Sequence, residues 1–113
     1  MSNITYFKGN SKDLKSVITK AAGLVVVDFF ADWCQPCKAL GQVLPKLASD
    51  YPQVKFLKSN IDESPELADD FQVMSIPNVK FFKNKVHADP LQPVATVVGL
   101  NLGKIKSTLD EFK

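Results

Sequence analysis

The strongest pattern in this chain is an apolar run over residues 24–30, in which only Asp28 carries a charge. Hydrophobic residues fill both alternating positions, which is typical of a strand covered on both faces. β-Branched and aromatic side chains dominate the run, so we predict that it forms the central strand of a sheet. Four further stretches with strand character predict the other strands: residues 3–8, 54–61, 79–82 and 94–98.

Four amphipathic stretches with apolar residues at helical spacing predict helices. The longest covers residues 34–51, and its apolar stripe continues past Pro45. The proline ring faces the carbonyl of Gly41, so we expect a bend and not a break. The other three helices are expected to begin at polar capping residues, namely Asn10 or Ser11, Ser64, and Asn101. The first of these three is expected to end at Gly23.

The order of these elements predicts an α/β fold. Strand, helix, strand, helix, strand requires parallel pairing with right-handed crossovers. The last two strands have no helix between them and should form an antiparallel hairpin. We therefore expect a central mixed five-stranded sheet flanked by four helices on both faces, in a single domain that spans residues 1–113.

Composition excludes several classes of function. With 113 residues, 45% of them hydrophobic, the chain can bury a core without a disulfide to hold it together. All 14 basic residues are lysines, so the bidentate arginine contact to phosphates and guanines is missing, and nucleic acid is not an expected partner. The N-terminal residues carry neither a signal-peptide pattern nor a membrane span. We therefore expect a cytoplasmic protein that does not bind membranes.

The only two cysteines, Cys34 and Cys37, lie three positions apart, shortly after the apolar strand. In a helix, Cα atoms at this spacing are about 5 Å apart, within the range that a disulfide needs. Cys34 falls at the helix start, where free N–H groups and the helix dipole favour a thiolate, and the turn at Pro36 favours its exposure. Cys37 lies one turn further in and should stay protonated. We predict that Cys34 is the nucleophile and Cys37 the resolving thiol.

Two other interpretations of the cysteine pair are a structural zinc site and a pair of unreactive buried thiols. Zinc needs three or four protein ligands, and beyond the cysteines the sequence offers only His87, in a predicted loop. We therefore expect neither a metal ion nor a cofactor. Unreactive thiols are disfavoured by the position of Cys34 at a helix start.

A carboxylate inside the central strand is the second chemical signal. Burial raises the pKa of an aspartate, which would suit Asp28 to accept a proton from Cys37 near neutral pH. A solvated strand end or a satisfied structural carboxylate is the alternative. Lys58 can place its amine within reach of Asp28 if their two strands are neighbours, although a solvated lysine at a strand end fits the pattern equally well.

Four motifs, in this order, resemble those of the thioredoxin family over nearly the whole chain. They are Val27-Asp28-Phe29, Trp33-Cys34-Gln35-Pro36-Cys37, Ile76-Pro77 and Val98-Gly99. Lys58 also falls where the family carries a lysine. The resemblance implies a thioredoxin-like three-layer fold and a cis-proline turn at Pro77. It also implies a protein-disulfide reductase whose cysteine pair cycles between dithiol and disulfide.

The same resemblance implies a groove for client proteins, and it implies partners. An extended client segment would pair with the backbone of Ile76 as an added strand. The residues that would form the groove are Trp33, Gln35, Pro36, Ile76, Pro77 and Gly99. Clients would be disulfide-containing proteins such as peroxiredoxins, and a thioredoxin reductase drawing on NADPH would recycle the oxidised protein. We expect a monomer.

Several positions depart from the family pattern. Gln35 replaces a glycine, Phe30 a tryptophan and Asn78 a threonine, and a longer loop at residues 84–93 replaces a tight hairpin turn. Gln35 is neutral, so it should not activate Cys34 as a charged neighbour would. Two alternatives to a reductase stay open from the sequence. One is a disulfide oxidase or isomerase, which would need a less reducing potential, and the other is a binding module of the same fold without turnover.

Overall fold

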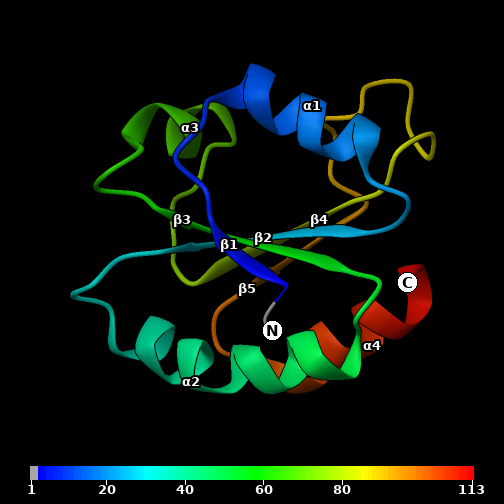
Figure 1. Cartoon of the computed structure of the whole chain (residues 1–113). Helices are drawn as coiled ribbons and strands as arrows, with labels where there is room; N and C mark the ends of the chain where they lie inside the picture. The colour runs from blue at the N-terminus through cyan, green and yellow to red at the C-terminus, as the bar shows by residue number, and fades with distance from the viewer. Residues whose placement is uncertain (1–2) are drawn as a thin grey trace.

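The computed structural model describes residues 3–113, in which a central sheet lies between two layers of helices (Figure 1). The chain follows the predicted α/β order, ending in two consecutive strands and a helix. Its elements are β1 (Ile4–Tyr6), α1 (Ser11–Lys20), β2 (Val25–Phe30), α2 (Gln35–Asp50), β3 (Lys55–Asn60), α3 (Pro65–Asp70), β4 (Asn78–Phe82), β5 (Ala95–Val98) and α4 (Leu102–Phe112).

β2 is the central strand of the sheet, as predicted. The strands are ordered β1-β3-β2-β4-β5, and β2 pairs in parallel with β3 and antiparallel with β4. β1 runs parallel to β3, and β5 antiparallel to β4, so the parallel first half and the final hairpin are both confirmed. Every residue of β2 is buried, Asp28 included. This position explains why its sequence is apolar at both alternating positions.

Two hydrophobic cores lie on opposite faces of the sheet. α1 and α3 cover one face, and α2 and α4 cover the other (Figure 1). Val27 and Phe29 of β2 belong to the first core, together with Leu14 of α1. Val26 belongs to the second core, together with Leu40 of α2. Burial of side chains of this size contributes about 1.5–3 kcal/mol each, so these two layers of packing hold the fold together.

The predicted N-cap residues are confirmed for all three helices, although only two of them cap through a side chain. Asn10 forms a reciprocal capping box with Asp13 at the start of α1. Asn101 accepts the N–H of Lys104 at the start of α4. Ser64 precedes α3, but its side chain forms no capping hydrogen bond. The Ser64 carbonyl accepts the N–H of Ala68, so this residue closes the first turn of α3 through its backbone.

α1 ends earlier than predicted, and α2 runs unbroken as predicted. Ala21 already has an extended backbone (φ −72°, ψ 140°), so the chain leaves the helix two residues before Gly23. α2 continues through Pro45 from Gln35 to Asp50. The proline therefore does not break the helix, and a bend at this position stays a prediction.

The ends of four strands meet at one edge of the sheet. The last residues of β2 and β3, Phe30 and Asn60, are partners in the parallel register. Asn78, at the start of β4, is paired with Phe29 on one side and with Val98, the last residue of β5, on the other. Segments far apart in the sequence therefore converge here. In open α/β sheets, functional sites form at the carboxyl ends of parallel strands.

Candidate active site

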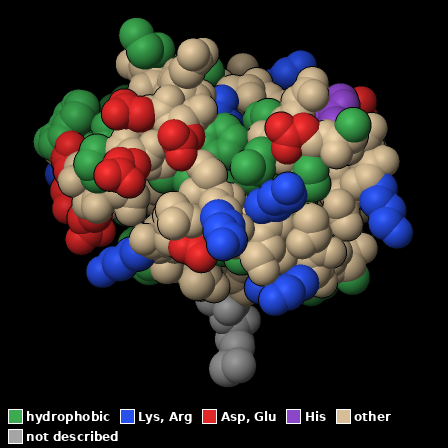
Figure 2. Space-filling model, turned by 90° about the horizontal axis from the view of Figure 1, so that it is seen from above, with side chains coloured by type: hydrophobic (Ala, Val, Ile, Leu, Met, Phe, Trp, Pro, Cys, Tyr) green, Lys and Arg blue, Asp and Glu red, His purple; other side chains and the backbone are tan. Residues whose placement is uncertain are grey.

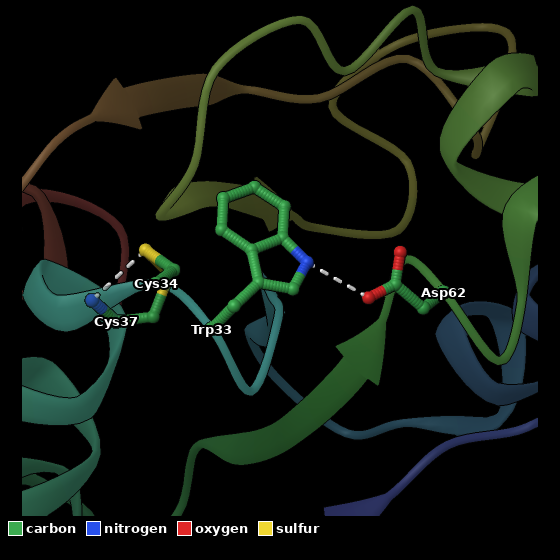
Figure 3. The surroundings of a disulfide bond; sticks show 4 residues. All are labelled: Trp33, Cys34, Cys37 and Asp62. Carbon is green, nitrogen blue, oxygen red and sulfur yellow. Dashed lines mark hydrogen bonds between the residues drawn. A yellow bond between two sulfur atoms is a disulfide. The ribbon is translucent and has the colours of Figure 1, made fainter.

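The Cys34–Cys37 pair lies at this edge, where the chain passes from β2 into α2. The two cysteines form a disulfide, and their Cα atoms are 5.2 Å apart, as the spacing predicts. Cys34 is the N-cap residue of α2, and its Sγ accepts a hydrogen bond from the Cys37 N–H at 3.2 Å (Figure 3). A sulfur atom in this position interacts with N–H groups that have no partner inside the helix, and these groups stabilise negative charge on it.

The cysteine pair is buried in the disulfide form. Cys34 is 5% exposed and Cys37 is 3% exposed, and both belong to a cluster with Phe30, Ala31 and the partly buried Ile76. The exposure that we expected for Cys34 is therefore wrong for this form, because these apolar side chains pack around the pair. No cluster of three or more His, Cys, Asp or Glu side chains in residues 3–113 is arranged to hold a metal ion.

Asp28 is buried in β2 without a hydrogen-bond partner. The side chain is 1% exposed, and within the described part of the chain neither carboxylate oxygen accepts a hydrogen bond. Desolvation raises the pKa of Asp28 to about 6, and the charge of Lys58 partly offsets this rise. Asp28 is therefore not at a solvated strand end, and no described residue satisfies its carboxylate. A carboxyl group that titrates close to neutral pH can exchange a proton with a thiol.

Lys58 is the register neighbour of Asp28, so the two strands are adjacent as the hypothesis required. Its amine nevertheless does not pair with the carboxylate. Lys58 Nζ lies over the ring of Phe30, 4.5 Å from its centroid, and 5.3 Å from the centroid of Tyr6. The effect of Lys58 on Asp28 is therefore electrostatic and acts without a direct contact.

The Ile76-Pro77 segment and the Gly99 turn are joined next to the start of β4. The Ile76-Pro77 peptide bond is cis, as the resemblance implied. The N–H of Gly99 donates to the Pro77 carbonyl at 2.8 Å, and Gly99 has a φ of +87°, a conformation that favours glycine. Ile76 packs against the cluster that contains the cysteines. The structure therefore connects these three groove residues to the disulfide.

Trp33 is held by a residue that the sequence analysis did not find. The indole is 67% exposed, and its Nε1–H donates to Oδ2 of Asp62 at 3.0 Å (Figure 3). Asp62 lies in the turn after β3, where Asn60 Oδ1 accepts the N–H groups of Asp62 and Glu63. An asparagine at the end of a strand, followed by two acids, is the only local signal for this turn. Nothing in the sequence connects it to a tryptophan 29 positions earlier.

Several exposed apolar side chains lie close in sequence to the predicted groove residues. Gln35 and Pro36 are exposed next to Cys34. Met74 is 92% exposed two positions before Ile76, and Val98 and Leu100 are exposed on either side of Gly99. No local pattern in the sequence marks Met74 or Leu100 as part of this surface. The exposed apolar side chains of this set, namely Pro36, Met74, Val98 and Leu100, are referred to as the apolar rim.

Acidic side chains gather at the α3 end of the face that carries α1 and α3. Figure 2 looks down on this face and shows the acidic side chains concentrated at one end. The exposed acids of this segment are Asp62, Glu63, Glu66, Asp69 and Asp70. The whole chain has a formal net charge of +2, so its charge is unevenly distributed. Trp33 therefore lies beside a negatively charged part of the surface.

A family model named Thioredoxin matches residues 6–110 of this chain. The chain belongs to the thioredoxin family. Thioredoxin-1 of Saccharomyces cerevisiae is 37% identical over 106 residues, which are 94% of this chain and 95% of that protein. A solved structure of Trichomonas vaginalis thioredoxin has a TM-score of 0.91 at 37% identity, with full coverage of both chains. The thioredoxin of Chlamydia trachomatis is 52% identical over 64 residues, so that match spans 57% of this chain and 63% of the relative.

These comparisons confirm the thioredoxin-like three-layer fold. Family membership and a cysteine pair at disulfide distance together support thiol-disulfide oxidoreductase activity of the protein-disulfide reductase type. They also indicate the kind of partner that a thioredoxin has, namely a thioredoxin reductase and disulfide-containing client proteins. Neither the oxidase or isomerase alternative nor the binding module is favoured.

The hydrogen bond from Trp33 to Asp62 leads to a first prediction. Asp62→Ala should release the indole, raise the KM for a protein client about two- to fivefold and lower the fluorescence anisotropy of Trp33, because an exposed hydrogen bond to a charged group stabilises one ring orientation. Trp33 is the only tryptophan, so its emission reports this ring alone. Asp69→Ala is the matched control, since it removes an exposed acid that does not bond Trp33. Equal effects of the two variants would attribute the change to charge and contradict the role of the hydrogen bond.

Proposed function

We propose that this thioredoxin reduces disulfides of client proteins through a Cys34 thiolate. In the reduced protein, Cys34 Sγ attacks one sulfur of the client disulfide and forms a mixed disulfide, while the other client sulfur leaves as a thiolate. Cys37 then attacks Cys34 Sγ and releases the second client thiolate. The client gains two electrons, and the protein gains the Cys34–Cys37 disulfide. The observation that carries this proposal is the position of Cys34 as N-cap of α2, with its Sγ accepting the Cys37 N–H.

Asp28 would accept the proton that Cys37 must lose before it can attack. A thiol deprotonates slowly in an apolar cluster unless a base is available. Asp28 is supported in this role by its burial, by the lack of a hydrogen-bond partner and by its raised pKa of about 6. Lys58 would act on Asp28 electrostatically, as a charge on the neighbouring strand. The proton would pass directly or through a water molecule.

The client would bind in the groove formed by the predicted residues. Trp33, Gln35 and Pro36 are exposed on one side of the disulfide. The backbone of Ile76 would pair with an extended client segment, and Pro77 and Gly99 would shape the groove beside it. Support for this arrangement comes from the apolar rim and from the hydrogen bond that joins the Pro77 and Gly99 segments.

The proposed chemistry also suggests partners and a location for the protein. The disulfide left on the protein after each turnover needs a reductant, which we propose to be an NADPH-dependent thioredoxin reductase. Peroxiredoxins fit as clients, because reduction of peroxide leaves an oxidised cysteine on them. No helix among residues 3–113 is long and apolar enough to cross a membrane. We propose a cytoplasmic monomer in which residues 1–113 form one thioredoxin domain, acting on neither nucleic acid nor membranes.

A redox titration tests the direction of the reaction. The protein is equilibrated with dithiothreitol or glutathione couples, and the oxidised fraction is measured by thiol labelling, alongside reduction of a generic disulfide protein. We expect a potential close to that of reducing thioredoxins, about −270 mV, and turnover of the client. A potential near −180 to −120 mV would favour the oxidase or isomerase alternative. Absence of turnover at a reducing potential would favour the binding module.

A further inference from the structure

Three residues from neighbouring strands form one row across the face of the sheet that α2 covers. Tyr6 of β1 is the register partner of Lys58 of β3, and Lys58 is the register partner of Asp28 of β2. In a parallel sheet, register partners project to the same face. An aromatic ring, an ammonium group and a carboxylate therefore lie side by side, and this Tyr6–Lys58–Asp28 row leads from the edge of the sheet to its centre (Figure 1).

A surface groove of about 460 Å³ lies beside this row, between the sheet and α2. Tyr6, Phe30 and Lys58 line it on the sheet side, and Cys37 and Gly41 line it on the α2 side. Gly41 leaves space there, because a Cβ atom at this position would lie 3.4 Å from Lys58 Nζ. Lys58 and Cys37 therefore line the same groove, with the Lys58 ammonium close to Gly41 of α2.

Aromatic rings, and not the carboxylate, hold the Lys58 ammonium. Lys58 Nζ lies 4.5 Å from the ring centroid of Phe30 and 5.3 Å from that of Tyr6. The two rings meet edge to face, with centroids 6.2 Å apart. Asp28, although adjacent in register, receives no hydrogen bond from any described residue. Rings at these distances attract a cation through their negatively charged faces, so they compete with Asp28 for the ammonium.

The position of Tyr6 is difficult to explain by packing. Its side chain is 65% exposed, on an edge strand of three residues. Phe30, the other ring of the pair, is buried and belongs to the cluster that contains both cysteines. Tyr6 therefore adds little to the core, but it supplies one of the two faces that the ammonium contacts.

We propose that Tyr6 is a positioning residue of the redox reaction, which with Phe30 holds the Lys58 ammonium in the groove and away from the Asp28 carboxyl. This inference rests on the proton-accepting role proposed for Asp28. A direct ion pair with Lys58 would fix Asp28 in its ionised form and make it a poor acceptor for the Cys37 proton. With the ammonium held on the aromatic rings, Asp28 keeps its affinity for a proton near neutral pH.

Few other charges face this part of the molecule. The turn after β2 contributes Asp32 to the groove, and α2 contributes Lys38 and the disulfide-bonded Cys37. β4 contributes an apolar residue, Val79, as the register partner of Asp28. Among the described residues, Lys58 is the charge that lowers the pKa of Asp28, against the larger effect of burial. A change in the position of Lys58 should therefore be visible in that titration.

The test compares Tyr6→Leu with the conservative Tyr6→Phe, using ¹³C NMR of aspartate-labelled, oxidised protein to titrate the Asp28 carboxyl. Tyr6→Phe keeps the aromatic face, so we expect its titration midpoint to match that of the natural chain. Tyr6→Leu should lower the proton affinity of Asp28 about two- to fivefold, because the ammonium moves toward the carboxylate. The titration midpoint should therefore fall by roughly half a pH unit. An unchanged or higher midpoint in Tyr6→Leu would overturn the proposal, as would the same shift in both variants.

A double-mutant cycle with Lys58→Met separates positioning from a general structural effect. If Tyr6 acts through the ammonium, Tyr6→Leu should not move the Asp28 midpoint once Lys58 is replaced. A shift that persists in the double variant would also overturn the proposal. The titration is carried out on the disulfide form without a client. A failure of the proposed reductase function therefore shows in the turnover assay, and a failure of this inference shows in the NMR titration.

Discussion

Cys34→Ser should abolish reduction of client proteins and form no mixed disulfide, whereas Cys37→Ser should stop turnover and accumulate the mixed disulfide. Both expected results follow from the geometry of the Cys34–Cys37 pair. Cys34 Sγ is the atom that accepts an N–H at the start of α2, so it is the sulfur at which a thiolate is stabilised. Cys37 contributes the donor N–H from inside the helix and acts in the second step. Without it, the first attack still takes place, but nothing displaces the client.

The measurement is non-reducing electrophoresis with mass spectrometry after mixing each reduced variant with an oxidised client. Dithiothreitol should release the client from Cys37→Ser. We expect the loss of turnover in both variants to exceed about 10³-fold, since covalent exchange has no other route. The Asp62→Ala variant serves as a control that alters the site but keeps both thiols. Trapping by Cys34→Ser, with none by Cys37→Ser, would reverse the assignment of roles.

Asp28→Asn should stabilise the protein by about 3 kcal/mol at pH 7. The folded protein holds the Asp28 proton up to a pKa of about 6, whereas the reference value for an unperturbed aspartate is 3.8. The folded state therefore binds the Asp28 proton more tightly than the unfolded state does. As a result, the free energy of unfolding decreases as the pH rises from about 4 to about 6. Above that range the natural chain carries a buried, unpaired carboxylate that asparagine lacks. The magnitude is the difference between the two pKa values converted at 1.36 kcal/mol per pH unit.

Urea unfolding of both proteins between pH 3.5 and pH 8 measures this effect. Toward pH 3.5 the stabilities should converge, because Asp28 is then mostly protonated in both the folded and the unfolded chain. Asp32→Asn, which changes an exposed carboxylate four positions later, is the matched control and should follow the natural chain. Asp28→Asn should also slow the resolution of the mixed disulfide and remove its pH dependence near 6. A constant difference in stability at every pH would contradict the assignment to a titrating carboxyl.

The architecture was predictable from the sequence because its strongest signals are local. An apolar run at both alternating positions predicts a strand buried on both faces, and β2 is central. A cysteine pair placed just after that strand, with helical spacing, predicts a reactive site at the edge of the sheet. Burial of Asp28 follows from its position inside the same run. Each of these inferences depends on one continuous segment of sequence.

The contacts that the sequence did not predict join segments that are far apart. The bond from Trp33 to Asp62 depends on where the turn after β3 comes to lie next to the turn after β2. Tyr6 reaches the ammonium of Lys58 through a register that adjacent strands adopt only in the folded sheet. The burial of Cys34 depends in the same way on packing, since Ile76 comes from a distant segment. These two contacts and the burial of Cys34 all depend on how distant segments pack in the folded protein, which local sequence patterns do not encode.

The cap at the start of α2 links the stability of the protein to its redox state. Cys34 Sγ is at once the atom that exchanges electrons and the atom that closes the first turn of the helix. A thermodynamic cycle connects folding with oxidation, so any interaction that favours the folded dithiol over the folded disulfide shifts the reduction potential by the corresponding free energy. Substitutions in α2 that change the stability of its first turn differently in the dithiol and the disulfide should therefore alter the potential, even where they leave both cysteines untouched.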